Sequence, residues 1–285
     1  MHLALRRGSH NDAEACGHII YDAFKVLADN HKFPPDFPSA EIATGRVSTL
    51  LSHPGIYGVV AELDGRIVGS NFLDERSSIS GIGPISVDPT VQERGIGRRL
   101  MQDVLDRAAE QKFPGVRLLQ AGFNNRSLCL YTMLGFRSRE PISILQGKAL
   151  NAKISGYDVR PATEADADAC NRLCRQVHGH DRNGELIDAI RLRTASVVVR
   201  GDCITGYTSA IAFFGHAVAE TNADLMAMIA AAPEFGGPGF LVPTRNYELL
   251  SWCLGNRLRL VYQMTLMTIG LYNEPAGVWL PSEIY

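Results

Sequence analysis

The segment Gln92–Gly97 constrains this chain more than any other part of its sequence. It reads Gln-Glu-Arg-Gly-Ile-Gly, and it follows an apolar segment at residues 85–87 that is typical of a buried strand. Apolar residues after it recur at the helical period, which predicts a helix that begins at the two glycines. The first turn of a helix leaves backbone N–H groups unpaired at the positive end of its dipole, and glycines let an anion approach them closely. We therefore expect a diphosphate-binding turn, to which Arg94, Arg98 and Arg99 add positive charge.

Two familiar nucleotide motifs do not fit this segment. A dinucleotide fingerprint, Gly-x-Gly-x-x-Gly, would need a third glycine where this chain has Leu100. A P-loop would need Gly-Lys followed by Ser or Thr, which is absent. The pattern that remains is Gln-x-x-Gly-x-Gly after a strand, and taken alone it also fits an ordinary strand-to-helix turn.

A second patterned segment follows the predicted helix. After an apolar strand at residues 116–121, the chain from Asn124 reads Asn-Asn-Arg-Ser-Leu-Cys-Leu-Tyr-Thr-Met-Leu-Gly-Phe. The two segments together resemble the GCN5-related N-acetyltransferase (GNAT) superfamily, whose acetyl-CoA motif is Gln/Arg-x-x-Gly-x-Gly/Ala and whose next helix has an Asn, a small residue, Leu-Tyr and then Gly-Phe. The matching residues, in order, are Asn124, Ser127, Leu130-Tyr131 and Gly135-Phe136. The resemblance covers roughly residues 2–148.

Length and composition limit the classes of protein that this chain can represent. Its 285 residues suggest two domains, each large enough to bury a core. A hydrophobic content of 46% with 20% charged residues is typical of a soluble globular protein. The formal net charge of -2, without a dense basic stripe, argues against nucleic-acid binding. No run approaches the ~20 apolar residues that span a bilayer, and the N-terminus lacks an apolar signal core, so we expect a cytoplasmic protein with no membrane partner.

The spacing of cysteines and histidines predicts no metal site. The cysteines form no Cys-x-x-Cys pair and have no histidine at zinc spacing, so reduced and mostly buried thiols are expected. Cys170 and Cys174 lie one helical turn apart, which a packed apolar face explains. The run His178-Gly179-His180-Asp181 offers potential ligands, but such a tetrapeptide more often forms a solvated turn.

The second half of the chain resembles a degenerate copy of the first. Leu5–Cys16 aligns with Val159–Cys170 at an offset of 154 residues, and both segments read as a strand, a capping Ser or Thr and an acidic helix start. The copy lacks the glycine turn, because residues 220–224 lead directly into a helix with two carboxylates that would repel a diphosphate. Ser251 stands where the first half has Tyr131. We therefore expect the second half to bind no CoA.

The pattern of elements predicts an α/β fold of the mixed α+β type, in which two tandem GNAT-like domains each form a mostly antiparallel mixed sheet flanked by helices. Residues 1–148 are the expected catalytic domain that binds acetyl-CoA, and residues 157–285 are the expected degenerate domain without the CoA loop. A polar connection near residues 146–156 separates them. The first domain is predicted to contain strands at 3–7, 56–63, 66–74, 80–87, 116–122 and 136–145, and helices at 11–28, 39–52, 95–111 and 125–134.

The resemblance implies a place for the cofactor, between the strand before the glycine turn and the strand after its helix. Gly83-Pro84 would interrupt strand pairing, which would free the N–H groups of Ile85 and Val87 for the pantetheine arm and the thioester oxygen. Asn124 would bond the pantetheine arm, and its alternative role is a helix N-cap. The expected acetyl-CoA-binding residues are Ile85, Val87, Gln92, Glu93, Arg94, Gly95, Ile96, Gly97, Arg98 and Asn124.

Two catalytic roles follow from the expected chemistry. Tyr131 resembles the family tyrosine that donates a proton to the CoA sulfur, although a core aromatic position would also explain it. An alkylamine with a pKa of about 10.4 is mostly protonated at neutral pH, so a base or a water chain must take a proton. The strand before the glycine turn has no carboxylate, and Glu75, beside Asp74, is therefore the expected base. Asp29 or Asp36, in a Pro-rich loop, could attract a cationic amine.

The expected function is transfer of an acetyl group from acetyl-CoA to a primary amine of a small molecule or peptide, by direct attack in a ternary complex. Two alternatives stay open: transfer of a larger acyl group, and a non-catalytic CoA-binding regulatory module. The sequence leaves the identity of the amine undetermined, and it leaves a homodimer open.

Overall fold

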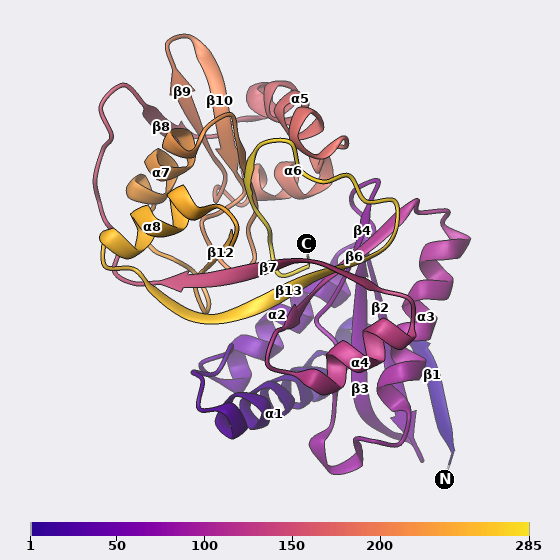
Figure 1. Cartoon of the computed structure of the whole chain (residues 1–285). Helices are drawn as coiled ribbons and strands as arrows, with labels where there is room; N and C mark the ends of the chain where they lie inside the picture. Colours follow the sequence, from indigo (N-terminus) through magenta and orange to yellow (C-terminus); the bar gives the residue numbers. More distant parts are fainter. Residues whose placement is uncertain (1, 285) are drawn as a thin grey trace.

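The computed structural model describes residues 2–284, which form two β-sheets with helices packed on them (Figure 1). Within these residues the larger sheet has nine strands in the order β1-β2-β3-β4-β6-β13-β7-β12, with β5 paired to β3 alone. The smaller sheet has five strands in the order β14-β11-β10-β9-β8. Among the strand pairs, β4 and β6 run parallel and the others run antiparallel. The expected mostly antiparallel mixed sheet is confirmed.

The elements of the first half follow the predicted pattern within a few residues. Its strands are β1 (Leu3–Arg7), β2 (Ile56–Leu63), β3 (Arg66–Asp74), β4 (Ser80–Ile82), β5 (Ser86–Val87), β6 (Gly115–Ala121) and β7 (Arg137–Gln146). Its α-helices are α1 (Ala13–His31), α2 (Ala40–Ser52), α3 (Ile96–Glu110) and α4 (Asn125–Met133). The agreement is good because hydrophobic periodicity is a local property of the sequence.

The predicted strand at residues 80–87 is interrupted, as expected from Gly83-Pro84. The structure divides it into β4 and β5, with the cis peptide Gly83–Pro84 between them. β4 pairs with both β3 and β6, whereas β5 pairs with β3 alone. One edge of β5 is therefore left open inside the sheet.

Helices cover both faces of the larger sheet. Leu100 and Val104 of α3 lie in a buried cluster on one face, and α4 contributes to the same cluster. Ile20 of α1 and Val47 of α2 lie in a second cluster on the other face. A ligand that enters the open edge of β5 would therefore meet α3 and α4 on one side and α1 on the other.

The second half contains the smaller sheet and the rest of the larger one. Its strands are β8 (Asp158–Pro161), β9 (Ser196–Arg200), β10 (Cys203–Thr208), β11 (Ala217–Ala219), β12 (Phe240–Pro243), β13 (Arg259–Gly270) and β14 (Val278–Leu280). Its α-helices are α5 (Ala167–His178), α6 (Asn183–Arg191), α7 (Asn222–Ala231) and α8 (Tyr247–Gly255).

The start of the first helix in each half shows the internal duplication at atomic level. Arg6 donates two hydrogen bonds to Asp12, at 2.9 and 2.7 Å, and Arg160 donates two to Asp166, both at 2.8 Å. In each half the backbone N–H three residues before the aspartate also bonds that carboxylate, at 2.7 and 2.8 Å. The two arrangements lie 154 residues apart in the sequence, which agrees with the predicted offset.

The two halves exchange strands within the larger sheet. β13, from the second half, lies between β6 and β7 of the first half and pairs with both along most of its length. β7 in turn pairs with β12, so the first half extends towards the second (Figure 1). The two expected domains, residues 1–148 and 157–285, therefore share one sheet. Sequence periodicity identifies strands but not the partners they pair with, and for this reason the exchange was not anticipated.

We predict that the aspartate of each helix start stabilises the fold in a pH-dependent way. The Arg6 guanidinium, together with the Ser9 hydrogen bonds, lowers the pKa of Asp12 to about 2 although burial opposes the shift. A lowered carboxyl pKa stabilises the folded state above the ordinary pKa near 4, and the contribution is lost as the pH falls through about 2. Asp12→Asn should reduce the free energy of unfolding by about 1 kcal/mol at neutral pH, after allowance for solvent screening.

Urea unfolding of the wild type and Asp12→Asn at neutral pH and near pH 3 measures this effect. Glu14→Gln is the matched control, because Glu14 is exposed at the same helix start. Equal losses in Asp12→Asn and Glu14→Gln, or a loss that persists unchanged in acid, would contradict the prediction.

Candidate functional site

A cavity of about 490 Å³ opens where β5 and β6 separate. β4 and β6 pair only at Ser80 with Val116 and at Gly81 with Arg117. Beyond these pairs β5 follows β3, and residues 85–87 and 118–121 line the cavity from its two sides. Its other walls come from α1, the glycine turn, α4 and three residues of the second half, which are Phe213, Met264 and Glu283.

The glycine turn lies at the mouth of the cavity and begins α3. Gly95 caps the helix in the left-handed conformation, with φ 78°. The first backbone bond of the helix runs from the Arg99 N–H to the Gly95 carbonyl at 3.1 Å. The N–H groups of residues 96–98 therefore have no acceptor within the helix, and these residues line the cavity. The geometry is that of an anion-binding helix N-terminus.

Packing alone does not require glycine at position 97. A Cβ atom there would have its nearest neighbours, on Leu130 and Val87, at 3.8 Å, which is ordinary contact. A Cβ on Gly95 would meet nothing within 4 Å, although its positive φ favours glycine. The space beside both residues opens onto the cavity, which leaves room for a ligand to approach the main chain.

Polar side chains hold the turn in place. The Gln92 amide donates to the Val87 carbonyl at 2.9 Å, and Arg126 donates to the Gln92 amide oxygen. Arg126 also pairs with Glu93 at 3.4 Å and lines the cavity, so it is a cation that sequence reasoning did not single out. Arg98 lines the cavity as well.

The arginines of the turn do not all face the cavity. Arg94 is exposed and is not among the lining residues, so the contribution expected from it stays a prediction. Arg99 instead donates to the Leu3 carbonyl at 3.0 Å, so its charge is directed towards β1. The expectation that Arg99 adds charge to the anion site is therefore wrong.

The open edge of β5 presents backbone donors to the cavity. The N–H group of Asp88 bonds the Val68 carbonyl of β3 at 2.8 Å. Successive N–H groups of an extended strand point to opposite edges. Those of Ile85 and Val87 therefore point away from β3, on the side where β5 has no partner.

Tyr131 and Asn124 both line the cavity from α4. The Tyr131 side chain is buried, which raises the pKa of its hydroxyl, and within residues 2–284 that hydroxyl makes no hydrogen bond. It is therefore protonated at neutral pH. The side-chain amide oxygen of Asn124 accepts from the Ser127 N–H at 3.2 Å, so this residue caps α4 and also lines the cavity.

Glu75, the expected base, is not placed at the cavity. Its carboxylate accepts two hydrogen bonds from Arg107 of α3, at 2.6 and 3.0 Å. The neighbouring Asp74 accepts from Arg76. The turn after β3 directs both carboxylates into ion pairs away from the cavity, so the assignment of Glu75 as the base is corrected.

Asp36 and Glu283 line the cavity instead, and Glu93 of the glycine turn lines it as well. Asp36 accepts a hydrogen bond from the Tyr262 hydroxyl at 2.5 Å, and burial raises the pKa of Asp36 to about 6. Asp29, the other aspartate considered, lies in α1 rather than in the loop and pairs with Lys25 on the surface. Glu283 was not anticipated, because it lies in the C-terminal tail after β14, and no local motif connects that tail with the glycine turn.

Residues 2–284 offer neither a membrane-spanning helix nor a cluster of metal ligands. No helix in this range combines the length and apolar character needed to cross a membrane. No group of three or more His, Cys, Asp and Glu side chains in the same range is arranged to hold a metal ion. In the run His178-Gly179-His180-Asp181, the Asp181 carboxylate pairs with Arg175 at 2.6 Å.

Comparison with known proteins identifies part of the chain by sequence. Residues 54–138 match the family model described as an acetyltransferase (GNAT) domain. A curated relative, mycothiol acetyltransferase of Tsukamurella paurometabola, is 35% identical over 82 residues. This match covers 28% of the present chain and 28% of that protein.

Comparison with solved structures covers nearly the whole chain. A proposed acetyltransferase from Pyrococcus horikoshii has a TM-score of 0.77 at 18% identity, over 97% of this chain and 92% of the other. A GCN5-related N-acetyltransferase from Sphaerobacter thermophilus has a TM-score of 0.64 at 14% identity, over 95% and 96%. A tandem GNAT protein from the clavulanic acid biosynthesis pathway has a TM-score of 0.57 at 15% identity, over 94% and 98%. These likenesses establish the fold. By sequence, residues 54–138 therefore form an acetyltransferase (GNAT) domain within this fold.

Proposed function

We propose that this chain is an acetyltransferase that moves an acetyl group from acetyl-CoA to a primary amine. The observation that supports this most strongly is the convergence on one cavity of unpaired helix N–H groups, the open edge of β5 and the Tyr131 hydroxyl. The curated relative is a mycothiol acetyltransferase, which agrees with acetyl transfer. Its match is short, so its acceptor is not transferred to this chain.

The cavity fits a CoA thioester at three places. The N–H groups of residues 96–98, with Arg98 beside them, suit the diphosphate. The N–H groups of Ile85 and Val87 suit the pantetheine amides and the thioester carbonyl. Asn124 is placed to meet the pantetheine arm, although its side-chain amide oxygen also caps α4. We infer that one acetyl-CoA binds here, at the break in the sheet.

The protein groups at this place supply what aminolysis of a thioester needs. A backbone N–H aimed at the thioester carbonyl stabilises the negative charge that develops on its oxygen as the amine attacks. Binding both reactants together removes the entropy cost of their encounter. The protonated Tyr131 hydroxyl can donate a proton to the departing sulfur. No nucleophile of the protein is required.

The second half offers no equivalent place for the diphosphate. α7 occupies the position of α3, and its first turn is capped by its own side chains rather than left open. Thr221 donates its N–H and hydroxyl to the Asp224 carboxylate, at 3.0 and 2.6 Å, and accepts from the Asp224 N–H at 3.3 Å. Because a buried carboxylate fills the site, we propose that each chain binds one CoA.

A first prediction separates the role of Gly97 in binding from any role in folding. Gly97→Ala should leave the free energy of unfolding unchanged or raise it by about 0.5–1 kcal/mol, because alanine favours the helix. It should weaken acetyl-CoA binding by roughly tenfold or more, because the new methyl group occupies space needed by the diphosphate. Calorimetry and thermal unfolding measure the two effects.

Gly45→Ala is the matched control, since a Cβ at this glycine of α2 meets nothing within 4 Å. It should raise stability and leave binding unchanged. A wild type that binds neither CoA nor acetyl-CoA while folded refutes the proposed function. A stoichiometry of two per chain refutes the inference that the second half binds none.

A second prediction concerns Tyr131. Tyr131→Phe keeps the ring in its buried place and removes the hydroxyl, so acetyl-CoA affinity should be preserved. Loss of a general acid should lower kcat by about 100-fold or more. The control is Tyr57→Phe, whose hydroxyl bonds Asp103 at 2.9 Å outside the cavity. Turnover on a panel of primary amines, with kcat of Tyr131→Phe equal to that of Tyr57→Phe, would contradict the role of Tyr131.

A further inference from the structure

The acceptor side of the cavity contains two partly buried carboxylates that come from distant parts of the chain. Asp36 belongs to the loop between α1 and α2, and Glu283 belongs to the tail after β14. Each is held by a partner: Tyr262 of β13 donates to Asp36 at 2.5 Å, and Arg46 of α2 donates to Glu283 at 2.9 Å. The second half thus supplies Glu283 itself and the hydroxyl that orients Asp36.

The tail is fixed where it enters the first half. The Glu283 N–H bonds the Phe213 carbonyl at 2.8 Å, and the next side chain, Ile284, is buried in the cluster beneath α1 and α2. Gly81 of β4 lies directly against this tail, because a Cβ at that position would stand 2.2 Å from the Ile284 carbonyl oxygen. The position of Glu283 is therefore determined by packing on both sides of it.

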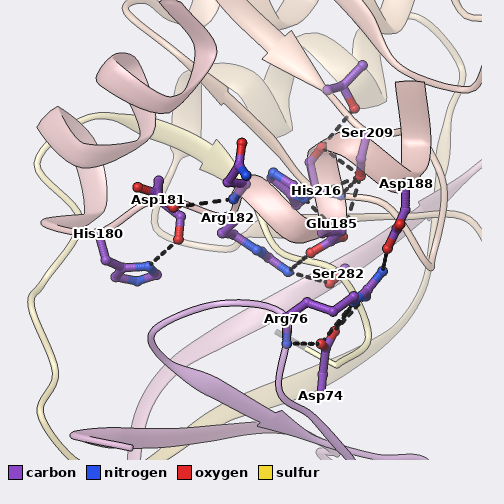
Figure 2. A network of polar contacts seen from close by, with 12 residues as sticks. Asp74, Arg76, His180, Asp181, Arg182, Glu185, Asp188, Ser209, His216 and Ser282 are labelled. Carbon is purple, nitrogen blue, oxygen red and sulfur yellow. Dashed lines mark hydrogen bonds and ion pairs between the residues drawn. The ribbon is translucent and has the colours of Figure 1, made fainter. Parts of the chain in front are cut away.

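A polar network continues this anchorage into the second half (Figure 2). Arg182 donates to the Ser282 hydroxyl at 2.9 Å and to Glu185 at 2.5 Å. Arg76, from the turn after β3, lies between Asp74 of the first half and Asp188 of α6 and bonds both. Ser282, the residue next to Glu283, is thus held by an ion pair of the second half, and Arg76 joins the two halves beside it.

Two polar atoms of the cavity wall lack a partner and show that a polar ligand is accommodated there. The Ser86 hydroxyl is buried and makes no hydrogen bond within the described residues. The Gln120 side-chain amide oxygen is also buried and also makes no hydrogen bond there. Both residues line the cavity. Ser86 pairs in register with Ser70, whose hydroxyl lies near the Cys16 thiol, so Ser86 faces the α1 side. Buried polar groups without partners are uncommon, and a ligand with hydrogen-bond donors would satisfy these two.

The charge at this side of the cavity favours a cation. Two carboxylates, Asp36 and Glu283, line this side, and the Arg46 guanidinium pairs with Glu283. The rest of this wall is largely apolar and includes Phe24, Leu27, Phe213 and Met264. An apolar surround strengthens the interaction between a carboxylate and a bound cation, because the local dielectric constant is low.

We infer that Asp36 and Glu283 together bind the ammonium group of a cationic acceptor and that Asp36 takes its proton. This inference rests on the proposed acetyl transfer and names the acceptor class of the same cavity. The raised pKa of Asp36, caused mainly by burial and increased by the charge of Glu283, agrees with the role of a proton acceptor near neutral pH.

The proton balance is complete with the groups present. The ammonium loses one proton to Asp36, and its nitrogen lone pair then forms the bond to the thioester carbon. As the carbon–sulfur bond breaks, the nitrogen loses a second proton to solvent and the sulfur takes one from Tyr131. Asp36 then releases its proton to solvent. Tyr131 takes up a proton from solvent. The net change is an amide, a thiol and one released proton.

The test measures amine binding directly, without turnover. Protein saturated with CoA is titrated calorimetrically with benzylamine, phenethylamine and spermidine, and with benzyl alcohol as the uncharged counterpart of benzylamine. We expect the wild type to bind at least one ammonium probe in preference to benzyl alcohol. Asp36→Asn and Glu283→Gln should each weaken that binding by roughly tenfold or more, because each removes a charge-assisted hydrogen bond.

Controls separate this proposal from the proposed function. Acetyl-CoA affinity should be unchanged in both variants, which also shows that they are folded. Asp29→Asn alters a surface carboxylate of the same region and should have no effect on amine binding. If the wild type binds acetyl-CoA but none of the ammonium probes, or if Asp36→Asn and Glu283→Gln bind them as the wild type does, the acceptor site is refuted and acetyl transfer is not.

A third variant tests the anchorage of the tail. Gly81→Ala should displace Ile284 and with it Glu283, so that amine binding falls as in Glu283→Gln while acetyl-CoA still binds. Unchanged amine binding in Gly81→Ala would contradict the role of packing in positioning Glu283. Gly45→Ala again serves as the control for a glycine with free space around it.

Discussion

The insertion of β13 between β6 and β7 is the constraint on which the rest of the structure depends. It places Tyr262 and Met264 beside a cavity that belongs by sequence to the first half. It also returns the chain to the larger sheet shortly before β14, so that the tail can reach β4. Each half would leave a sheet edge unpaired without the other, and unpaired edges are costly or prone to association. The two halves therefore form one cavity rather than a catalytic unit with a separate neighbour.

The duplicated halves differ at one turn, and elementary electrostatics explains the consequence. In the first half a left-handed glycine leaves the N–H groups of α3 open to the cavity. In the second half the Thr221 hydroxyl accepts from the Asp224 N–H in the first turn of α7, and the Asp224 carboxylate accepts from the Thr221 N–H and hydroxyl. The protein's own carboxylate thus lies at the positive end of the α7 dipole, whereas the start of α3 is open to a ligand.

Sequence reasoning predicted what depends on neighbouring residues and failed where distant segments meet. The glycine turn, the strand break at Gly83–Pro84 and the helix of Tyr131 are local patterns, and the structure has each of them in place. Glu75 was chosen as the base because it is near the motif in sequence, yet the turn after β3 directs it to Arg107. Glu283 could not be found in this way, since only the topology of the sheet shows where the C-terminal tail lies.

The buried ion pair of Arg182 and Glu185, within the second half, is better explained by positioning than by stability. Burial alone would raise the pKa of Glu185, but Arg182 and His216 keep it well below its ordinary value, so the carboxylate stays charged. The desolvation cost of such a group offsets much of the Coulombic gain, and apolar residues could fill the same space at lower cost. Apolar residues could not provide directional hydrogen bonds. Arg182 donates to both Glu185 and Ser282, and the second bond fixes the position of the tail one residue before Glu283. A carboxylate that must face a small cationic group needs its backbone held to within a fraction of an ångström. The network between the halves supplies that restraint from outside the cavity, where it leaves the acceptor side open.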